Sequence, residues 1–398
     1  MLINDTYHIS YCSNIHPGED WETTFLNIKK YIPEIKKEVS GEAPFGIGLR
    51  LSNIASEELG QGDNLQEFKA WLSDNNCYVF TMNGFPYGNF HKTVVKDQVH
   101  TPDWTTKERL VYTKRLFTQL KTLVPNGISG GISTSPISYK HWFTSDDAIS
   151  NAFKIGAEQL IEIVEQLYTI EKSSGKYLHL DIEPEPDGLI ENTKEFIDFY
   201  TNYLLPIGVD VLVPKLNLET SEIETIIKRY ITLCYDVCHF SLAYETPEHT
   251  FQAMEQAGIV VGKIQVSAAL KILFEEGKET NIWKSLERFD EPTYLHQVTE
   301  NVNGQVKVYN DLPIILQGSR QHKELRAHFH VPIFLEKFDD LYSTQDQILE
   351  TLAYLKKHQV SNHLEVETYT WDVLPETLKV DMSQSITREL NWLKDKLA

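Results

Sequence analysis

The sequence is poor in cysteine, which argues against a small secreted protein held together by disulfides. It has four cysteines in 398 residues, Cys12, Cys77, Cys234 and Cys238, and each lies within an apolar run. Cys234 and Cys238 are spaced too far apart to form a CxxC pair. A disulfide framework needs more cysteines than this, and buried thiols stay reduced in the cytoplasm. We therefore expect free thiols and a cytoplasmic location.

Other signals are missing as well. The N-terminal MLINDTYHIS has neither a basic start nor an apolar stretch of signal-peptide length. No run reaches the ~18 apolar residues that a membrane span needs. The chain has no block rich in Lys or Arg, and its formal net charge of -20 repels phosphate backbones and anionic lipid surfaces. We therefore expect no membrane span and no nucleic-acid partner.

Eight short apolar or alternating runs have the pattern of strands, and longer segments with helical spacing lie between them. The expected strands are 7–13, 45–52, 78–83, 130–135, 177–183, 233–240, 262–268 and 364–368. The expected helices are 21–37, 65–73, 107–123, 148–170, 193–204 with 221–229, 247–256 and 345–357. Strands and helices in alternation predict a parallel sheet, and eight repeats close a barrel. The glycine-rich GxGxxG loop of an open nucleotide-binding sheet is absent. The predicted fold class is α/β, a single (β/α)8 TIM barrel that covers 1–398.

The regular rhythm breaks between the seventh and eighth predicted strands, which lie about ninety-five residues apart. A simple connection in such a barrel is much shorter. Within this excursion, 294–298 and 305–309 alternate like strands and flank the turn-forming TENVNG. We expect a hairpin insertion at about 290–312 over the mouth of the barrel.

The fifth predicted strand ends in carboxylates at alternate positions. In LHLDIEPEPDG, the side chains of Asp181, Glu183 and Glu185 would share one face. A solvated acidic loop explains Glu185, but it explains Asp181 and Glu183 poorly because Leu178 and Leu180 imply a buried strand. Inward carboxylates repel one another unless a cation or a proton intervenes.

The next three strands end in further oxygen donors. Asp236 ends the sixth, Gln265 lies in the seventh, and Glu365 and Glu367 alternate in the eighth, so that one of these two faces inward. We predict that a divalent cation is held by Glu183, Asp236, Gln265 and Glu367. An oxygen-rich set favours Mn²⁺ or Mg²⁺, with Zn²⁺ or Co²⁺ as alternatives.

Histidines form a second candidate set. Asp236 and His239 are three residues apart, and they converge only if the chain turns out of the strand at Cys238 or His239. In AHFHVPIF, the spacing of His328 and His330 puts both imidazoles on one side of an extended segment. The residues leave two interpretations open, ordinary hydrogen-bonding histidines or a second transition-metal site shared with His239.

Together these residues resemble a known family. A Glu after strand five, DxCH at strand six, HxH in the excursion and ETYTW at strand eight resemble the xylose-isomerase-like barrel superfamily, which includes sugar isomerases, epimerases, inosose dehydratases and endonuclease IV. Over nearly the whole chain, HISYCSNIHPGEDW, APFGIGLRLSNIAS, TMNGFPYGNFH, ISTSPISYK, LDIEPEPDGLIENT and DVCHFSLAYE are similar to the ebo-cluster metabolite-traffic protein E family. The resemblance implies a metal-dependent barrel.

The resemblance also implies residue roles. Four residues match the single-metal pattern of hydroxypyruvate-isomerase-like members: Glu183, Asp236, Gln265 and Glu367. Three fall where endonuclease IV has histidines and an aspartate around its third zinc: His239, His328 and His330. His328 replaces that aspartate and Gln265 replaces a histidine, which argues against a full three-zinc cluster. His91 resembles one early zinc histidine of endonuclease IV, and His141 is a weaker candidate for the other.

Further polar groups near predicted strand ends are candidates for substrate contact: Asn14, His16, Arg50, Asn83, His91, Glu185, Tyr244 and Trp371. Arg50 is unusual because a buried charge needs a partner. It either pairs with an acidic neighbour or anchors a phosphate or carboxylate of the substrate.

These observations favour a divalent-metal-dependent isomerase or epimerase for a sugar, cyclitol, phosphosugar or related polyhydroxy small molecule. The cation would stabilise an enediolate, and Glu183 and Glu367 would act as the base and the acid. One alternative is a zinc-dependent phosphoester hydrolase of endonuclease IV type. Another is a non-catalytic metabolite-binding or carrier protein.

Overall fold

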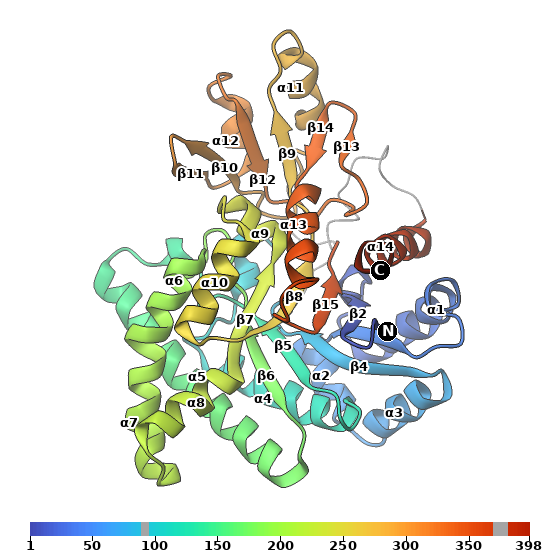
Figure 1. The fold of residues 1–398 in the computed structure, drawn as a ribbon, viewed down its shortest axis with the longest axis vertical. Helices are drawn as coiled ribbons and strands as arrows, with labels where there is room; N and C mark the ends of the chain where they lie inside the picture. Colours follow the sequence, from blue (N-terminus) through green and yellow to red (C-terminus); the bar gives the residue numbers. More distant parts are fainter. Residues whose placement is uncertain (89–94, 369–380) are drawn as a thin grey trace.

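The computed structural model describes residues 1–88, 95–368 and 381–398, so that two predicted site residues, His91 and Trp371, lie outside the described residues. Within these ranges, the larger sheet holds eight parallel strands and a short antiparallel edge strand, β1 (Leu2–Ile3) (Figure 1). In sheet order the parallel strands are β2 (Tyr7–Tyr11), β15 (His363–Val366), β8 (Val261–Val266), β7 (Ile231–Asp236), β6 (Leu178–Ile182), β5 (Gly130–Thr134), β4 (Cys77–Asn83) and β3 (Phe45–Arg50). The eight predicted strands are present, and their ends differ by at most two residues except in the sixth, 233–240, whose counterpart β7 ends already at Asp236.

The two ends of this sheet meet and close the barrel. Cys12, just after β2, forms a parallel bridge with Gly48 of β3. The backbone N–H of Arg50 donates a hydrogen bond to Ser13 Oγ at 2.8 Å across the same seam. The predicted fold class, a (β/α)8 TIM barrel, is therefore confirmed.

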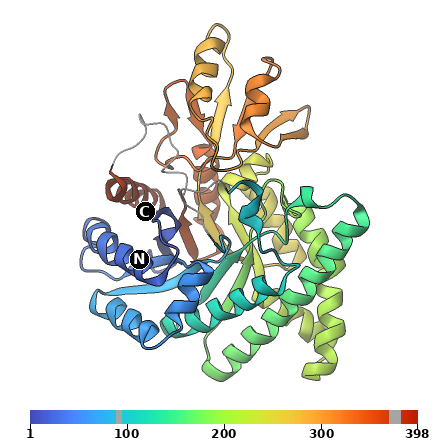
Figure 2. The ribbon, with the colours of Figure 1, turned by 180° about the vertical axis from the view of Figure 1, so that it is seen from behind.

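Helices surround the barrel, as Figures 1 and 2 show from opposite sides. The larger ones are α1 (Trp21–Val39), α3 (Asn64–Asp74), α4 (Lys107–Leu123), α5 (Asp146–Ser174), α8 (Thr220–Tyr230), α10 (Pro247–Ala257), α13 (Gln345–Leu355) and α14 (Met382–Leu397). Helix α1 shows why these segments are helical. Asp20 caps it by accepting from Thr23 N at 2.7 Å, and Ile28, Ile32 and Ile35 are buried at helical spacing. The helices thus cover the apolar outer face of the sheet.

One helical stretch, Thr193–Leu216, is long and apolar enough to cross a membrane by length and composition. It consists of α6 (Thr193–Phe199), a π-helical turn (Tyr200–Leu204) and α7 (Leu205–Leu216). About a third of its most apolar window is buried, 33%, and it packs against α5 and α8. A helix that covers the core of a barrel has the same composition, so this stretch is weak evidence for a membrane span.

The excursion between β8 and β15 forms a second, antiparallel sheet, which lies at the top of Figure 1. Its order is β11 (Gln305–Tyr309), β10 (Val298–Val302), β12 (Glu324–Ala327), β9 (Leu270–Leu273), β14 (Leu341–Ser343) and β13 (Lys337–Phe338). Two helices, α11 (Glu279–Glu287) and α12 (Leu312–Gln317), accompany it. The excursion is therefore much more than the predicted hairpin.

The predicted hairpin exists, but its first strand was placed too early. The structure pairs β10 with β11 through a two-residue turn, and both turn residues, Asn303 and Gly304, have positive φ. Such a turn matches the twist of paired strands, and Asn-Gly is its preferred sequence. All four residues of TENV therefore pair as strand and do not form a loop.

The inside of the barrel is polar. His179 Nδ1 and Asp181 Oδ1 lie 2.6 Å apart on β6, and Lys263 of β8 forms an ion pair with Glu365 of β15. All four side chains are buried. The Asp181 carboxylate, predicted to face inward, is therefore bound by His179 and Thr232 inside the barrel.

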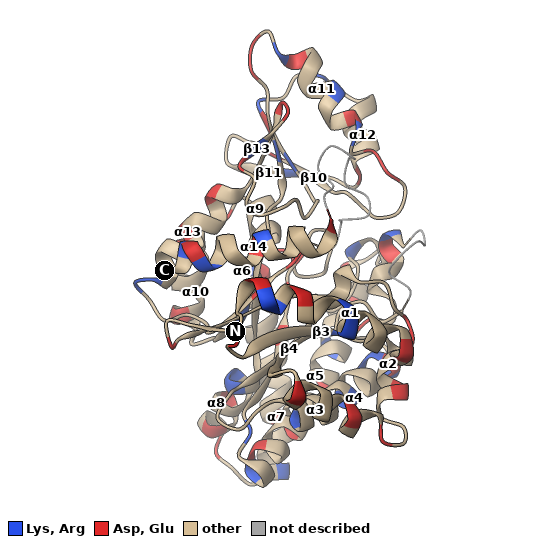
Figure 3. Cartoon of the chain, turned by 90° about the vertical axis from the view of Figure 1, so that its right-hand side faces the viewer, with Lys and Arg blue, Asp and Glu red and all other residues tan. Residues whose placement is uncertain are grey.

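Charged residues of both signs are interspersed on the outer helices, as Figure 3 shows. Arg229 and Glu171, for example, lie 2.6 Å apart on neighbouring helices, and both are partly exposed. Exposed pairs of this kind contribute little to stability. The acidic excess of the chain is thus spread over the surface and within the barrel mouth.

Candidate metal centre

Three carboxylates meet at the carboxyl ends of the parallel strands. Glu183 follows β6, Asp236 ends β7 and Glu367 follows β15, and their ligand atoms all lie within 4.8 Å of one another. All three side chains are buried. Catalytic groups in barrels of this type come from the ends of several strands at this face. The structure therefore brings together three of the four predicted oxygen ligands.

These buried carboxylates repel one another when all three are charged. Burial, and then repulsion from Glu367 and Asp236, raises the pKa of Glu183 well above its usual range. Burial and Asp236 raise the pKa of Glu367 to about 8. Buried like charges need a proton or a cation between them. The arrangement therefore fits a divalent cation with oxygen ligands.

Gln265, the fourth predicted ligand, lies beside Asp236. The two residues are register partners on β8 and β7, so their side chains leave the same face of the sheet. Gln265 is fully buried, and within the described residues neither its oxygen nor its nitrogen has a hydrogen-bond partner. Asp236 Oδ2 is in the same situation. An amide oxygen and a carboxylate oxygen without partners are the donors that a hard cation would take.

Two amides hold Glu367 in place. Asn14 Nδ2 and Asn83 Nδ2 donate to the same oxygen, Glu367 Oε1, at 2.7 and 2.9 Å. The other oxygen, Oε2, lies 3.9 Å from His330 Nδ1. Asn14 and Asn83, predicted as substrate contacts, are thus placed at the site by their bonds to a carboxylate.

The strand that carries Asp236 ends earlier than predicted. β7 stops at Asp236, and the short helix α9 (Val237–Leu242) begins there. Asp236 Oδ1 caps this helix by accepting from His239 N at 3.1 Å, and Ser267 Oγ donates to the same oxygen at 2.7 Å. The turn that brings Asp236 and His239 together is therefore a helix start. The prediction of a strand up to Phe240 is wrong.

Three imidazoles lie next to the carboxylates, and each is anchored through Nδ1. His239 Nδ1 lies 3.0 Å from the carbonyl oxygen of Pro184, His330 Nδ1 lies 3.0 Å from that of Glu367, and His328 Nδ1 lies 2.9 Å from Gln297 Oε1. These oxygens can only accept, so each Nδ1 carries the hydrogen. Burial lowers the pKa of all three imidazoles, which are therefore neutral. Their Nε2 atoms carry lone pairs.

Two of these lone pairs point at one another. His239 Nε2 and His328 Nε2 are 3.1 Å apart, with their rings perpendicular. Two lone pairs at this distance repel. Two nitrogens bound to one ion at 2.0–2.1 Å lie about 2.9–3.4 Å apart for octahedral or tetrahedral angles, so the observed separation fits a shared cation. Anchoring of the second ring nitrogen on an oxygen is the usual arrangement for metal-bound histidine.

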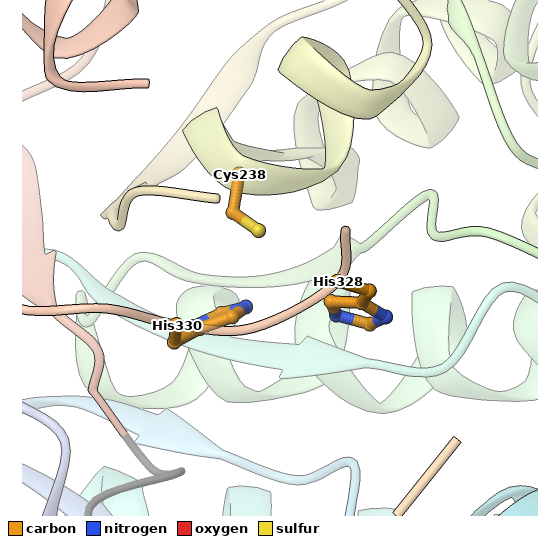
Figure 4. A group of neighbouring side chains, drawn as sticks. All are labelled: Cys238, His328 and His330. Atoms are coloured by element: carbon orange, nitrogen blue, oxygen red, sulfur yellow. The ribbon is translucent and has the colours of Figure 1, made fainter. Parts of the chain in front are cut away.

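Other donors surround the imidazoles. Asp236 lies within 4.8 Å of ligand atoms of His239 and His330, and Cys238 within 4.8 Å of those of His328 and His330. Figure 4 shows Cys238 reaching from α9 toward the segment that carries both histidines. The sequence pointed to the histidines but not to Cys238 as a donor. Nitrogen and sulfur donors favour Zn²⁺ or Co²⁺ over Mg²⁺.

A small cavity of about 70 Å³ lies beside these groups. Its lining includes four side chains that the sequence analysis did not name: Lys96, His100, Tyr294 and Gln297. The segment after residue 94 touches the excursion across the mouth, because Val95 N donates to Thr293 O at 2.9 Å and Lys96 Nζ lies 2.7 Å from Asp311. The cavity is smaller than usual small-molecule sites.

The remaining candidates divide into those near the cavity and those away from it. Glu185 lines the cavity and lies 3.0 Å from His100 Nε2, whereas His141 pairs with Asp187 at 3.0 Å. His16 stacks on Tyr31 and contacts Tyr11.

The side chains of Arg50 and Tyr244 also make their contacts away from the cavity. The Arg50 guanidinium donates to the carbonyl groups of Gly18, Pro86 and Gly88 and pairs with Glu19, so it ties two loops together. Tyr244 packs under the Arg326 guanidinium. Within the described residues, His16, Arg50 and Tyr244 do not line the cavity.

Comparison with known proteins shows the fold. No protein-family model and no curated protein sequence matches the chain. A xylose isomerase-like TIM barrel protein from Mycobacterium smegmatis in complex with magnesium has a TM-score of 0.50 at 10% identity, covering 100% of this chain and 98% of that chain. A D-tagatose 3-epimerase-like protein has a TM-score of 0.48 at 10% identity, covering 98% of this chain and 97% of that chain. IOLI protein with a bound zinc atom has a TM-score of 0.47 at 12% identity, covering 98% of each chain. At such identities the likeness is one of fold, the TIM barrel.

Proposed function

We propose that the chain is a divalent-metal-dependent isomerase or epimerase that acts on a small sugar, cyclitol or phosphosugar through an enediolate. The observation that carries the proposal is the buried group of Glu183, Asp236 and Glu367 with Gln265 beside it. Buried carboxylates with raised pKa values suit proton transfer near neutral pH. The magnesium complex of the barrel from Mycobacterium smegmatis gives further support for a cation in this fold.

The two proposed catalytic carboxylates lie on different strands. Glu183 follows β6 and Glu367 follows β15, with β7 and β8 between them. In this proposal Glu183 removes a proton from the carbon beside the substrate carbonyl, and Glu367 returns a proton to the substrate. Asn14 and Asn83 hold one oxygen of Glu367 and leave the other for this transfer. A bound divalent cation would polarise the carbonyl and an adjacent hydroxyl.

The imidazoles add a second cation position to the proposal. Asp236 belongs both to the carboxylate group and to the group with His239 and His330, so this residue would be shared between the two cation positions. Bridged ions ~3.5–4 Å apart are typical of phosphoester hydrolases. This observation favours, as the second candidate, a zinc-dependent phosphoester hydrolase. The two candidates differ in the fate of the substrate, namely rearrangement at carbon or cleavage of a phosphoester.

Two finer points belong to the same proposal. The resemblance of the long motifs to the ebo-cluster metabolite-traffic protein E family would place the reaction in metabolite traffic, although no family model or curated sequence matches the chain. The four cysteines are free and buried, which agrees with a cytoplasmic location. A non-catalytic metabolite carrier has less use for three buried acidic ligands, since neutral donors cost less to bury.

The proposal is tested by carbon–proton exchange. Metal-free protein is reloaded with Mn²⁺, Mg²⁺, Zn²⁺ or Co²⁺ and incubated in D₂O with a panel of ketoses, aldoses, cyclitols and their phosphates. NMR should then show deuterium at carbon, and Glu183→Gln should lower its rate by about 100-fold or more because general base catalysis is lost. Glu275→Gln, at a carboxylate on the surface of the excursion, is the matched control. Phosphate release without carbon exchange would favour the hydrolase, and binding without either reaction would favour a carrier.

A further inference from the structure

Gln297 lies between the excursion and the barrel mouth, where it contacts both. It directly precedes β10 and is 4% exposed. Its side-chain amide reaches His328 on one side and the exit of β6 on the other. We propose that Gln297 is a positioning residue that sets the tautomer and the ring orientation of His328, so that His328 Nε2 faces the second cation position. This inference rests on the second position proposed above.

The orientation of the Gln297 amide follows from its neighbours. Gln297 Nε2 donates to the carbonyl oxygen of Pro186 at 3.3 Å. A carbonyl can only accept, so the amide nitrogen must face Pro186 and Oε1 must face His328. His328 Nδ1 lies 2.9 Å from that oxygen and must therefore donate. The only nitrogen of His328 left with a lone pair is Nε2, which lies 3.1 Å from His239 Nε2.

The backbone around His328 is held by the same short segment. His328 N donates to Gln297 O at 2.9 Å, which extends the antiparallel pairing of β10 with β12 by one residue. His296 Nδ1 lies 2.8 Å from His328 O, and the His296 ring stacks on Phe329. Because the backbone N–H and C=O of His328 are both hydrogen-bonded, two variables remain, the rotation of the ring and its tautomer, and Gln297 Oε1 restricts both.

The excursion thereby acquires a chemical role. It carries His328 and Gln297, and each of them has a partner in the barrel: His239 of α9 for His328, and the carbonyl of Pro186 after β6 for Gln297. A partner that orients a metal-bound histidine typically changes metal affinity by about 10–100-fold when it is removed. Replacing Gln297 should therefore weaken cation binding at the imidazole site and leave cation binding at the carboxylate site nearly unchanged.

Two variants separate orientation from packing. Gln297→Leu keeps the approximate volume but removes the acceptor, so His328 can place its hydrogen on either nitrogen. Gln297→Glu loses the donor to the Pro186 carbonyl but keeps an oxygen acceptor toward His328 Nδ1, so it should preserve the tautomer. Gln305→Leu, at an exposed position of β11 in the same sheet, is the matched control.

The experiment has two readouts on full-length protein. Long-range ¹H–¹⁵N NMR of labelled histidine in metal-free protein reports the tautomer directly, and Zn²⁺ or Co²⁺ titration with elemental analysis reports each cation site. We expect wild type, Gln297→Glu and Gln305→Leu to hold His328 with hydrogen on Nδ1 and to bind two ions. Gln297→Leu should show mixed tautomers, should bind the second ion about 10–100-fold more weakly, and should keep the first.

The outcomes distinguish this inference from the proposal on which it rests. If Gln297→Leu keeps the tautomer and binds two ions like wild type, the role of Gln297 is overturned. If the wild type binds one ion, the second position fails, yet the NMR readout still shows whether Gln297 orients His328. Equal losses in Gln297→Leu and Gln297→Glu would also overturn the inference, because they would indicate a packing effect.

Discussion

At the scale of residues, the ion pair inside the barrel is as distinctive as the candidate site. TIM barrels usually fill this space with branched apolar side chains. Here Lys263 and Glu365 are both fully buried, and Lys263 Nζ also donates to Ser133 Oγ at 3.4 Å. Burial alone would lower the pKa of Lys263, but Glu365 outweighs it and raises the pKa. A Cβ at Gly48 would lie 1.7 Å from Glu365 Oε1, so glycine provides the room for this carboxylate.

Replacing one member of the Lys263–Glu365 ion pair should destabilise the folded protein much more than replacing both members. Lys263→Met leaves the Glu365 charge buried without its cation, and we expect it to lower the free energy of unfolding by about 3–5 kcal/mol. The double variant Lys263→Met with Glu365→Leu should recover most of that loss. Urea unfolding of the wild type, both single variants and the double variant measures the coupling. Additive losses would contradict a coupled pair.

The sequence revealed the inward residues better than their partners. The sequence analysis expected one of Glu365 and Glu367 to face inward, but both are buried, because residues two apart on an extended chain share a face. The partner of Glu365 is Lys263 on another strand, and the partner of Asp181 is His179 on the same strand. The first pairing depends on which strands are neighbours, and this information is not local.

At the scale of elements, whether a segment forms a helix or a strand was easier to predict than the residues at which it begins and ends. β7 illustrates the reason, since the apolar run in LCYDVCHFSL continues through the change from strand to helix at Asp236. The hydrophobic pattern therefore does not mark where the strand ends and the helix begins. The helix cap formed by Asp236 marks this position. Helix α14 was not predicted, although it covers the barrel beside α1 and supports segments next to the site.

Helix α14 reaches the site through Glu389. This buried carboxylate accepts from Ile333 N at 3.1 Å and from Thr368 Oγ1 at 2.7 Å, next to the segments that carry His330 and Glu367. Burial raises the pKa of Glu389 from 4.5 to about 7, against the hydrogen bonds from Thr368 and Ile333. The folded state therefore binds a proton that the unfolded state releases, and this contribution to stability is lost as the pH rises from 4.5 through about 7.

Glu389→Gln should remove this pH dependence. Glutamine keeps an oxygen that accepts both hydrogen bonds and carries no charge at any pH. We expect the variant to be about as stable as the wild type near ~pH 5 and more stable near ~pH 8. Urea unfolding at both pH values measures this, with Glu275→Gln on the surface as the control. A constant difference between the variant and the wild type at the two pH values would contradict the assignment.

At the scale of the whole molecule, the excursion and the barrel make the site together. The barrel was predictable because its eight strands and most of its helices are local patterns repeated in order. The six-stranded sheet was not, because β9, β12 and β14 pair across long stretches of chain. That sheet brings His328 and Gln297 over the mouth, so the pocket wall also could not be predicted from local patterns.

Cation binding at the acidic mouth of the barrel should release protons, so that the affinity for the cation depends on pH. Glu367 has a pKa of about 8, so below that pH a cation must displace a proton to bind. Apparent affinity should therefore rise with pH up to about 8 and then level off. A cation at about 100 times its dissociation constant stabilises the folded state by about 2.7 kcal/mol, which gives a measurable rise in melting temperature.

We therefore expect the Mn²⁺- or Zn²⁺-induced rise in melting temperature to be larger near ~pH 8 than near ~pH 6, and to shrink with added salt because the formal charge of -20 attracts cations over a distance. Scanning calorimetry with and without cation at each pH measures both effects. In Glu367→Gln the proton is no longer displaced at this position, so both the rise and its pH dependence should be smaller. A rise that is equal at both pH values in the wild type would show that Glu367 does not bind the cation.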